Sequence, residues 1–317
     1  MNYLVTGGAG FIGSHLVDRL LAEGQSVVCL DNFDDFYNPT IKRRNLTRAL
    51  KDSKFRLVEG DLRDEGLLNR IFQEEEVEIV AHLAARAGVR PSIENPLLYA
   101  EVNIRGTLNL LEACKKYKVR RLVFASSSSV YGNNPKVPFA EEDPVDNPIS
   151  PYAATKKAGE LICHTYHHLY QMDIACLRYF TVYGPRQRPE MAIHQFTRRI
   201  HQGRKITLFG DGSSRRDYTY IEDAIEGTIA ALGREHGYEI YNIGESQTTP
   251  LSQLVQWIED QLGKKARVEY LPAQPGDVER TYADIRKASE RLGYRPRTDI
   301  REGLARFTRW YLQDGLK

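Results

Sequence analysis

A cluster of four glycines separates the first apolar run of the chain from the first amphipathic run. In YLVTGGAGFIGSHLVDRLL these are Gly7, Gly8, Gly10 and Gly13, between an expected strand at residues 3–6 and an expected helix. Glycines at such a turn let the backbone approach a pyrophosphate, whose charge then faces the helix N-terminus. The turn favours a dinucleotide-binding unit, although an ordinary glycine-rich turn is the alternative when the motif is taken alone.

Short apolar runs alternate with amphipathic stretches through the first half of the chain. The runs are YLVT at 3, SVVCL at 26, FRLVEG at 55, VEIVAHLAA at 77, RLVFASS at 121 and IACLRYF at 174. Between them, stretches such as NIRGTLNLLEACKKY repeat apolar residues at helical spacing. The alternation predicts an α/β fold with a doubly wound parallel sheet.

The pattern loosens near residue 185, where segments rich in Pro and Gly begin. This change predicts a dinucleotide-binding domain over residues 1–184 and a smaller lobe over 185–317. The run YEIYNIG at 238 is a candidate strand of the main sheet, so some later segments are expected to return to the first domain.

Composition narrows the function classes. The 317 residues carry a net charge of only +2, which gives no basic face for nucleic acid. No apolar run approaches membrane-spanning length, and the first residues run straight into an expected strand. The four cysteines are widely spaced, without metal-site or disulfide-framework spacing, so we expect free thiols, no metal and a cytoplasmic location.

Polar residues at the ends of the expected strands point to the dinucleotide. Asp31 ends the second run about twenty residues after the glycines, where a carboxylate accepts from the ribose hydroxyls of NAD and repels a 2′-phosphate. Asp61 and Leu62 end the third run and are expected to bracket the adenine. His82 belongs to the fourth run and is interpreted as a packed or supporting histidine.

Tyr152 and Lys156 form the one Tyr-x-x-x-Lys of the sequence, in SPYAATKKAGE. A four-residue separation places both side chains on one helix face. A nearby ammonium favours phenolate and lowers the pKa of a tyrosine toward that of a useful general base. The alternative is an ordinary amphipathic helix.

Together these motifs, with SSSVYG, RYFTVYGP and RRDYTYIED, resemble those of the extended short-chain dehydrogenase/reductase family, specifically its nucleotide-sugar epimerases and dehydratases. The match spans about residues 1 to 285. The resemblance implies a Rossmann fold, a tightly held NAD, a UDP-sugar bound mainly by the C-terminal lobe, and a transient 4-keto sugar.

The resemblance also implies roles for individual residues. Tyr152 takes the proton of the sugar C4 hydroxyl, Lys156 binds the nicotinamide ribose and Ser127 hydrogen-bonds the C4 oxygen. The implied cofactor-binding residues are Gly7, Gly10, Phe11, Ile12, Gly13, Asp31, Asn32, Asp61, Leu62, Leu83, Ala84, Ala85, Asn103, Tyr152, Lys156 and Tyr179.

The residues after Ser127 separate the reactions of the family. Dehydratases resemble TDEVYG and decarboxylases TSEVYG, whereas this chain has Ser128 and Ser129 in place of the acidic residues. The pattern is closest to UDP-glucuronate 4-epimerases, in which neutral hydroxyls can donate to a C6 carboxylate. Thr181 and Arg188 match further positions near that carboxylate, while Arg186 could instead face phosphate or solvent.

The resemblance also implies which residues bind the UDP part of the substrate. Arg216 matches a position that contacts the pyrophosphate, and Asp277 one that contacts the uridine-side ribose. Thr281 stands where a bulky residue would exclude a 2-acetamido sugar, so UDP-glucose and UDP-N-acetylglucosamine remain alternative substrates.

A different class of function is also possible for this fold, namely a catalytically silent sensor that binds NAD. Helices around residues 98–117 and 152–170 match those that pair in family homodimers.

Overall fold

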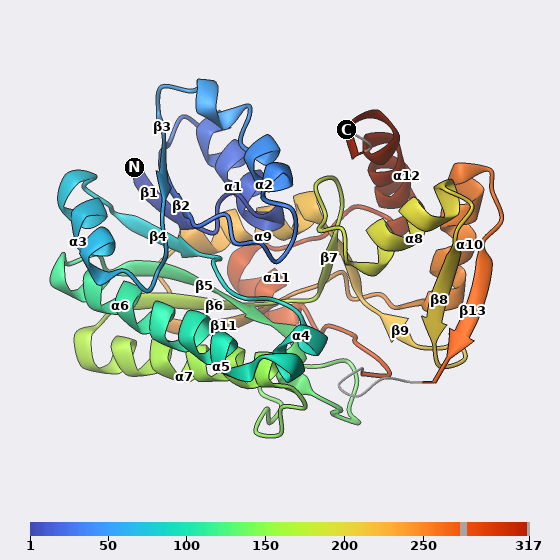
Figure 1. Ribbon diagram of the computed structural model, residues 1–317. Helices are drawn as coiled ribbons and strands as arrows, with labels where there is room; N and C mark the ends of the chain where they lie inside the picture. The colour runs from blue at the N-terminus through green and yellow to red at the C-terminus, as the bar shows by residue number, and fades with distance from the viewer. Residues whose placement is uncertain (273–277, 316–317) are drawn as a thin grey trace.

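A seven-stranded parallel sheet forms the centre of the protein (Figure 1). The computed structural model describes residues 1–272 and 278–315. Its strands lie in the order β11-β6-β5-β4-β1-β2-β3, so the order reverses between β1 and β4. Their bounds are β1 Asn2–Thr6, β2 Ser26–Asp31, β3 Phe55–Glu59, β4 Ile79–His82, β5 Arg121–Ser127, β6 Asp173–Tyr179 and β11 Tyr238–Ile243. The predicted doubly wound sheet is confirmed.

Helices cover both faces of this sheet because its strands are apolar on both sides. Val5 and Val123 pack in the cluster that contains α1 and α9, whereas Leu4 and Leu122 pack in the cluster that contains α3, α6 and α7. The helices on the first face are α1 Phe11–Ala22, α9 Ile221–Leu232 and α11 Arg286–Leu292; those on the second are α3 Glu65–Glu74, α6 Gly106–Lys116 and α7 Pro151–Tyr170.

Shorter helical elements lie in the connections that follow the strands of the main sheet. They are α2 Pro39–Asn45, η1 Ala49–Lys51, α4 Val89–Glu94, α5 Pro96–Ala100, η2 Glu101–Arg105 and η3 Ser128–Tyr131. The π-helical η2 continues from α5 into α6, and these helices run beside α7 (Figure 1).

The later part of the chain builds a smaller lobe with three two-stranded sheets, β7–β10, β9–β12 and β8–β13. Its elements are β7 Thr181–Tyr183, α8 Ala192–His201, β8 Lys205–Phe209, β9 Arg215–Arg216, β10 Tyr218–Tyr220, β12 Thr249–Pro250, α10 Leu251–Leu262, β13 Arg267–Leu271, α12 Ile300–Trp310 and η4 Tyr311–Gly315. None of the helices described is both long and apolar enough to cross a membrane.

Strand β11 pairs in parallel with β6 at the edge of the main sheet, and α9 packs against α1 and β5. Segments from beyond residue 184 are therefore part of the main sheet and of its helical cover. A division of the chain at residue 184 stays a prediction.

Candidate active site

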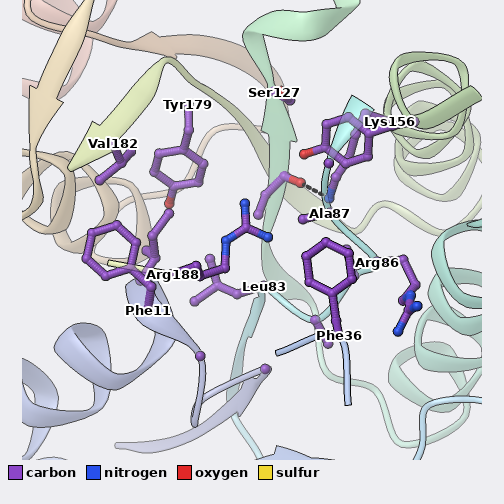
Figure 2. Close-up of a pocket in the computed structure, with 18 of the residues that line it drawn as sticks. Phe11, Phe36, Leu83, Arg86, Ala87, Ser127, Lys156, Tyr179, Val182 and Arg188 are labelled. Atoms are coloured by element: carbon purple, nitrogen blue, oxygen red, sulfur yellow. Dashed lines mark hydrogen bonds between the residues drawn. The ribbon is translucent and has the colours of Figure 1, made fainter. Parts of the chain in front are cut away.

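A cavity of about 510 Å³ opens at the carboxyl ends of the central strands (Figure 2). This edge of an open parallel sheet, where the strand order reverses, is where such folds bind ligands. Residues singled out in the sequence line it: Gly7, Gly10, Phe11, Ile12, Gly13, Asp31, Asn32, Asp61, Leu62, Leu83, Ala84, Ala85, Ser127, Ser128, Ser129, Tyr152, Lys156, Tyr179, Thr181, Arg188 and Arg216. Asp277 lies outside the described residues.

The glycine-rich turn has no space for larger side chains. Gly7 has a positive φ of 70°, and a Cβ there would lie 2.7 Å from the backbone nitrogen of Ala84. A Cβ on Gly13 would lie 2.2 Å from the carbonyl oxygen of Gly7. Helix α1 begins after Gly10, which lacks a side chain to cap it, so its first amides can bind an anion in the cavity.

The carboxylate of Asp31 is fixed at the end of β2. Its two oxygens accept from the backbone nitrogens of Ala9 and Phe33, at 3.0 and 2.9 Å. A carboxylate has about four acceptor positions, so capacity remains for two ligand hydroxyls. Burial raises the pKa of Asp31, while the charge of Lys42 and the two backbone hydrogen bonds lower it.

Asp61 accepts more hydrogen bonds from neighbouring side chains than the sequence suggests. Arg63 donates to both of its oxygens, at 2.9 and 2.8 Å, and Asn32 donates to one at 3.0 Å. Hydrogen bonding to Arg63 is the largest cause that lowers the pKa of Asp61 to about 2. The side chain therefore remains ionised at the cavity wall and fixes Asn32 beside it.

His82 supports the loop that follows β4. Thr107 Oγ1 donates to the Asn103 carbonyl at 2.6 Å, so it accepts from His82 Nε2 at 2.9 Å. His82 Nδ1 then accepts from Thr6 Oγ1 at 2.8 Å, and Thr6 in turn accepts from the backbone of Ala84 at 3.2 Å. Burial, with the charge of Lys156, lowers the pKa of His82 to about 3, so the neutral ring holds this network together.

Asn103 lies behind the same loop rather than on the cavity wall. Its side chain accepts from the Arg86 nitrogen at 2.8 Å and donates to the Arg86 carbonyl at 3.0 Å and to Thr155 Oγ1 at 3.0 Å. Asn103 therefore holds the loop after β4 against α7. The family resemblance implies instead that Asn103 contacts the cofactor.

Tyr152 stands in the first turn of α7, which Ser150 caps by accepting from Ala153 at 3.2 Å. Burial raises the pKa of Tyr152, whereas a hydrogen bond with Ser127 and the charge of Arg188 lower it. The tyrosine, the serine and the arginine converge although they come from α7, β5 and the loop after β7.

Lys156 lies near Tyr152, as its spacing predicts, but its ammonium binds a backbone carbonyl. Its Nζ donates to the Ala125 carbonyl at 2.6 Å and stands 6.0 Å from the centre of the Tyr152 ring. The bond to Ala125 keeps it beneath the end of β5, so Arg188 is the cation that lowers the pKa of Tyr152. Burial lowers the pKa of Lys156 itself to about 8.

The serine run divides between the strand and a turn. Ser127 ends β5, and its Oγ accepts from the backbone of Ser129 at 3.2 Å, which starts the turn η3. Ser128 and Ser129 line the cavity, and the buried Oγ of Ser129 has no hydrogen-bond partner among the described residues. A buried hydroxyl of this kind is expected to meet a polar group of a ligand.

Behind the serines lies a buried ion pair that the sequence analysis missed. Arg178 donates to Glu160 through two nitrogens, at 2.8 and 2.9 Å, and Ser126 Oγ donates to the same carboxylate at 2.6 Å. Arg178 and Glu160 are 1% and 0% exposed. A charged residue inside the apolar run IACLRYF was the available signal, since buried charges are nearly always paired.

Phe36 was also missed, and it stands between two arginines at the cavity (Figure 2). The Arg86 guanidinium lies 5.1 Å from its ring centre and that of Arg188 lies 5.8 Å from it. Arg86 also pairs with Asp34. The stretch DNFDDFYNPT therefore covers the cavity from the β2 side.

Arg186 and Arg188 have separate surroundings. Arg188 lines the cavity, whereas Arg186 points to α1 and pairs with Asp18 at 2.8 Å. The structure therefore separates the two arginines, whose division of roles the sequence left open.

Thr181, Arg216 and Thr281 form the part of the wall that belongs to the lobe. The Thr281 hydroxyl accepts from the backbone of Asp217 at 3.1 Å, which holds its small side chain in place. Arg216 donates to the Glu279 carbonyl at 3.2 Å. The part of the cavity wall that the lobe contributes is therefore polar.

Comparison with known proteins agrees with this geometry. The family model described as GDP-mannose 4,6 dehydratase matches residues 4–307. The UDP-glucuronate 4-epimerase of Thermodesulfobacterium geofontis is 48% identical over 97% of this chain and 95% of its own.

Two solved structures cover nearly the whole of both chains. The UDP-glucuronic acid 4-epimerase of Bacillus cereus, in complex with UDP-glucuronic acid and NAD, is 40% identical with a TM-score of 0.93 and 99% of each chain covered. The UDP-glucose 4-epimerase of Thermotoga maritima, with UDP-glucose, is 36% identical with a TM-score of 0.92 and 100% of each chain covered. The fold, the cavity and these relatives show that the chain belongs to the GDP-mannose 4,6 dehydratase family of extended short-chain dehydrogenases/reductases.

Proposed function

We propose that this protein is an NAD-dependent UDP-sugar 4-epimerase whose substrate is UDP-glucuronate and whose product is UDP-galacturonate. One observation carries the substrate: Ser128, Ser129 and Arg188 line the same cavity as Tyr152, with hydroxyls where a dehydratase would carry acidic side chains. Hydroxyls and a guanidinium can bind a carboxylate without placing a negative charge beside it.

The residues of the cavity fit NAD. The first amides of α1 would hold its pyrophosphate and Asp31 its adenosine ribose, because the glycines leave the backbone open there and Asp31 retains acceptor capacity. Lys156 would hold the nicotinamide ribose. Bound NAD would supply a reversible hydride acceptor for the sugar C4.

Tyr152 is the proposed base for the C4 hydroxyl. Its pKa must fall from the value that burial imposes, and Ser127 and Arg188 both act in that direction. Ser127 is placed to hydrogen-bond the same C4 oxygen, because it interacts with Tyr152 at the end of β5. Tyr152 would take the proton from the C4 hydroxyl, with Ser127 hydrogen-bonded to the oxygen, and return it to that oxygen when the opposite epimer forms.

The enzyme must hold the C6 carboxylate of the sugar firmly if this group is not to be lost as carbon dioxide. A 4-keto uronic acid is a β-keto acid, which readily loses carbon dioxide when its carboxylate can orient for cleavage. The hydroxyl of Ser129, which has no partner among the described residues, would donate to the carboxylate together with Ser128, Thr181 and Arg188. This arrangement supports epimerisation over decarboxylation.

The nucleoside diphosphate would bind against the lobe. Arg216 is the proposed partner of the pyrophosphate, since a planar guanidinium suits phosphate oxygens. The proposed contact of Asp277 with the ribose concerns a residue outside the described part of the chain.

A neutral UDP-sugar is the second candidate substrate. Thr281 is small and lines the cavity, where a bulkier residue would crowd a C2 substituent, which supports UDP-N-acetylglucosamine as well as UDP-glucose. Anomeric-proton NMR after incubation with each of the three sugars tests the proposal. Turnover of a neutral sugar without turnover of UDP-glucuronate would overturn the substrate, and turnover of none would favour the sensor.

A homodimer is also proposed, through the helices beside α7. Large apolar side chains are exposed on α5, α6 and α7: Leu97, Leu108, Leu161, Leu169 and Tyr170. Exposed apolar residues gathered on neighbouring helices are typical of an interaction surface. Light scattering of the purified protein and of a Leu161→Lys variant tests this. A mass of one chain for the unaltered protein would contradict the homodimer, and an unchanged mass of two chains in the variant would contradict an interface at these helices. The cytoplasmic location stays a prediction.

A further inference from the structure

The loop over residues 184–190, between β7 and α8, carries Arg188 and is attached to helix α1. His15 Nε2 donates to the Pro185 carbonyl at 2.9 Å. Asp18 pairs with Arg186 at 2.8 Å, with the side chains of the two residues only 17% and 23% exposed. His15 and Asp18 are three residues apart, so they lie on one face of α1. The helix that begins at the glycine-rich turn thus holds the loop that bears Arg188.

The backbone of this loop needs such support. Arg186 has a φ of 66°, in the left-handed region that residues other than glycine rarely adopt. Gln187 donates from its backbone to the Gly184 carbonyl at 3.1 Å and from its buried side chain to the Val182 carbonyl at 3.1 Å. A conformation of this kind persists only where surrounding contacts determine it.

The side chain of Arg188 is held more loosely than the backbone of the loop. Its Nε lies 3.2 Å from a carboxylate oxygen of Glu190, whose side chain is 40% exposed, and its guanidinium lies 5.8 Å from the Phe36 ring centre. Figure 2 shows the guanidinium directed into the cavity. The position of the Arg188 guanidinium is therefore determined by the backbone that precedes this residue, rather than by a strong contact of its side chain.

We propose that His15 and Asp18 are positioning residues for the substrate: through Pro185 and Arg186 they set the place of Arg188, and with it the preference for a sugar that bears a C6 carboxylate. This inference rests on the proposed function.

The test compares Asp18→Ala with Arg19→Ala in the NAD-loaded enzyme. Arg19 is the next residue of α1 and pairs with Glu23 and Glu226, away from the loop, which makes it a matched control. Calorimetry measures the binding of UDP-glucuronate and of UDP to each protein. We expect Asp18→Ala to weaken UDP-glucuronate about tenfold with UDP within about twofold, and Arg19→Ala to change neither beyond about twofold.

A charge reversal separates positioning from a loss of stability. Asp18→Arg combined with Arg186→Asp restores an ion pair and is expected to recover most of the lost affinity, with the NAD content and melting temperature followed in every variant. Equal weakening of UDP and UDP-glucuronate, or unchanged binding in Asp18→Ala, would overturn the inference and leave the proposed function standing. Wild-type protein that binds UDP but not UDP-glucuronate would overturn both.

Discussion

Ser126 Oγ donates a 2.6 Å hydrogen bond to Glu160 Oε1, which joins the end of β5 to the middle of α7. One neighbour of Ser126 is Ser127, and Glu160 stands one turn after Lys156 on the same helix. Because Arg178 binds the same carboxylate from β6, three elements that carry or flank the proposed catalytic residues meet at one buried charge. The ion pair therefore contributes to the relative placement of Ser127, Tyr152 and Lys156.

Removal of Arg178 is expected to destabilise the fold strongly. Arg178→Met leaves the carboxylate of Glu160 buried without its main partner, and such a loss typically costs about 3–5 kcal/mol. Denaturant unfolding measures the effect. Arg306→Ala, which removes an exposed pair with Glu222 and Glu302, is the control and should cost no more than about 1 kcal/mol. Similar losses in the two variants would contradict the role given to the buried pair.

Gly7→Ala is expected to abolish NAD retention. Alanine disfavours the φ of 70° at this position, and its Cβ would meet the backbone of Ala84 at 2.7 Å. NAD released from the denatured protein measures occupancy. Gly203 has a φ of 67° with open space around it, so Gly203→Ala meets the same backbone strain without the clash. Loss of NAD in both variants would show that strain alone explains the result.

Tyr152→Phe is expected to lower turnover by at least about 10²-fold while NAD remains bound, because the variant removes the proposed base and leaves the ring in place. Product formation and NAD content are measured on the same preparation. A variant with substantial activity would remove Tyr152 from its proposed role.

Ser128→Ala combined with Ser129→Ala tests the recognition of the carboxylate. Loss of two donors should weaken UDP-glucuronate selectively, by roughly tenfold or more, or raise the share of decarboxylated product. NMR of the products and the ratio of kcat/KM for acidic and neutral sugars are the measurements. Equal effects on every sugar would count against a carboxylate site.

The buried ammonium of Lys156 predicts a dependence of stability on pH. Its pKa falls from 10.5 to about 8 on folding, so between these values the unfolded chain binds more protons and the free energy of unfolding rises with pH. Lys156→Met should reduce that rise, by up to roughly 3 kcal/mol between pH 8 and 10.5 in the NAD-free protein. Parallel pH profiles of the two proteins would contradict the depressed pKa.

Sequence patterns predicted the sheet because its signals are local. Apolar runs such as SVVCL and the glycine-rich turn have a pattern that is independent of the remainder of the chain. The residues that line the cavity at the strand ends could also be predicted, because the carboxyl ends of parallel strands meet at one edge of the sheet.

Contacts between distant segments could not be derived in this way. The pairing of Arg186 with Asp18 joins residues 168 positions apart, and nothing near either one indicates its partner. The spacing of Tyr152 and Lys156 indicates one helix face, but it could not show that the Ala125 carbonyl accepts from the ammonium at 2.6 Å. Such contacts depend on how β5, α1 and the loop after β7 pack.

The fold leaves the choice of sugar open, since solved epimerases of UDP-glucuronic acid and of UDP-glucose match it with TM-scores of 0.93 and 0.92. A time course of the anomeric protons of UDP-glucuronate incubated with the purified protein decides it most directly. We expect the UDP-galacturonate signal to grow to a stable ratio without formation of a pentose. A spectrum that shows only UDP-glucuronate, or a UDP-pentose, would contradict it.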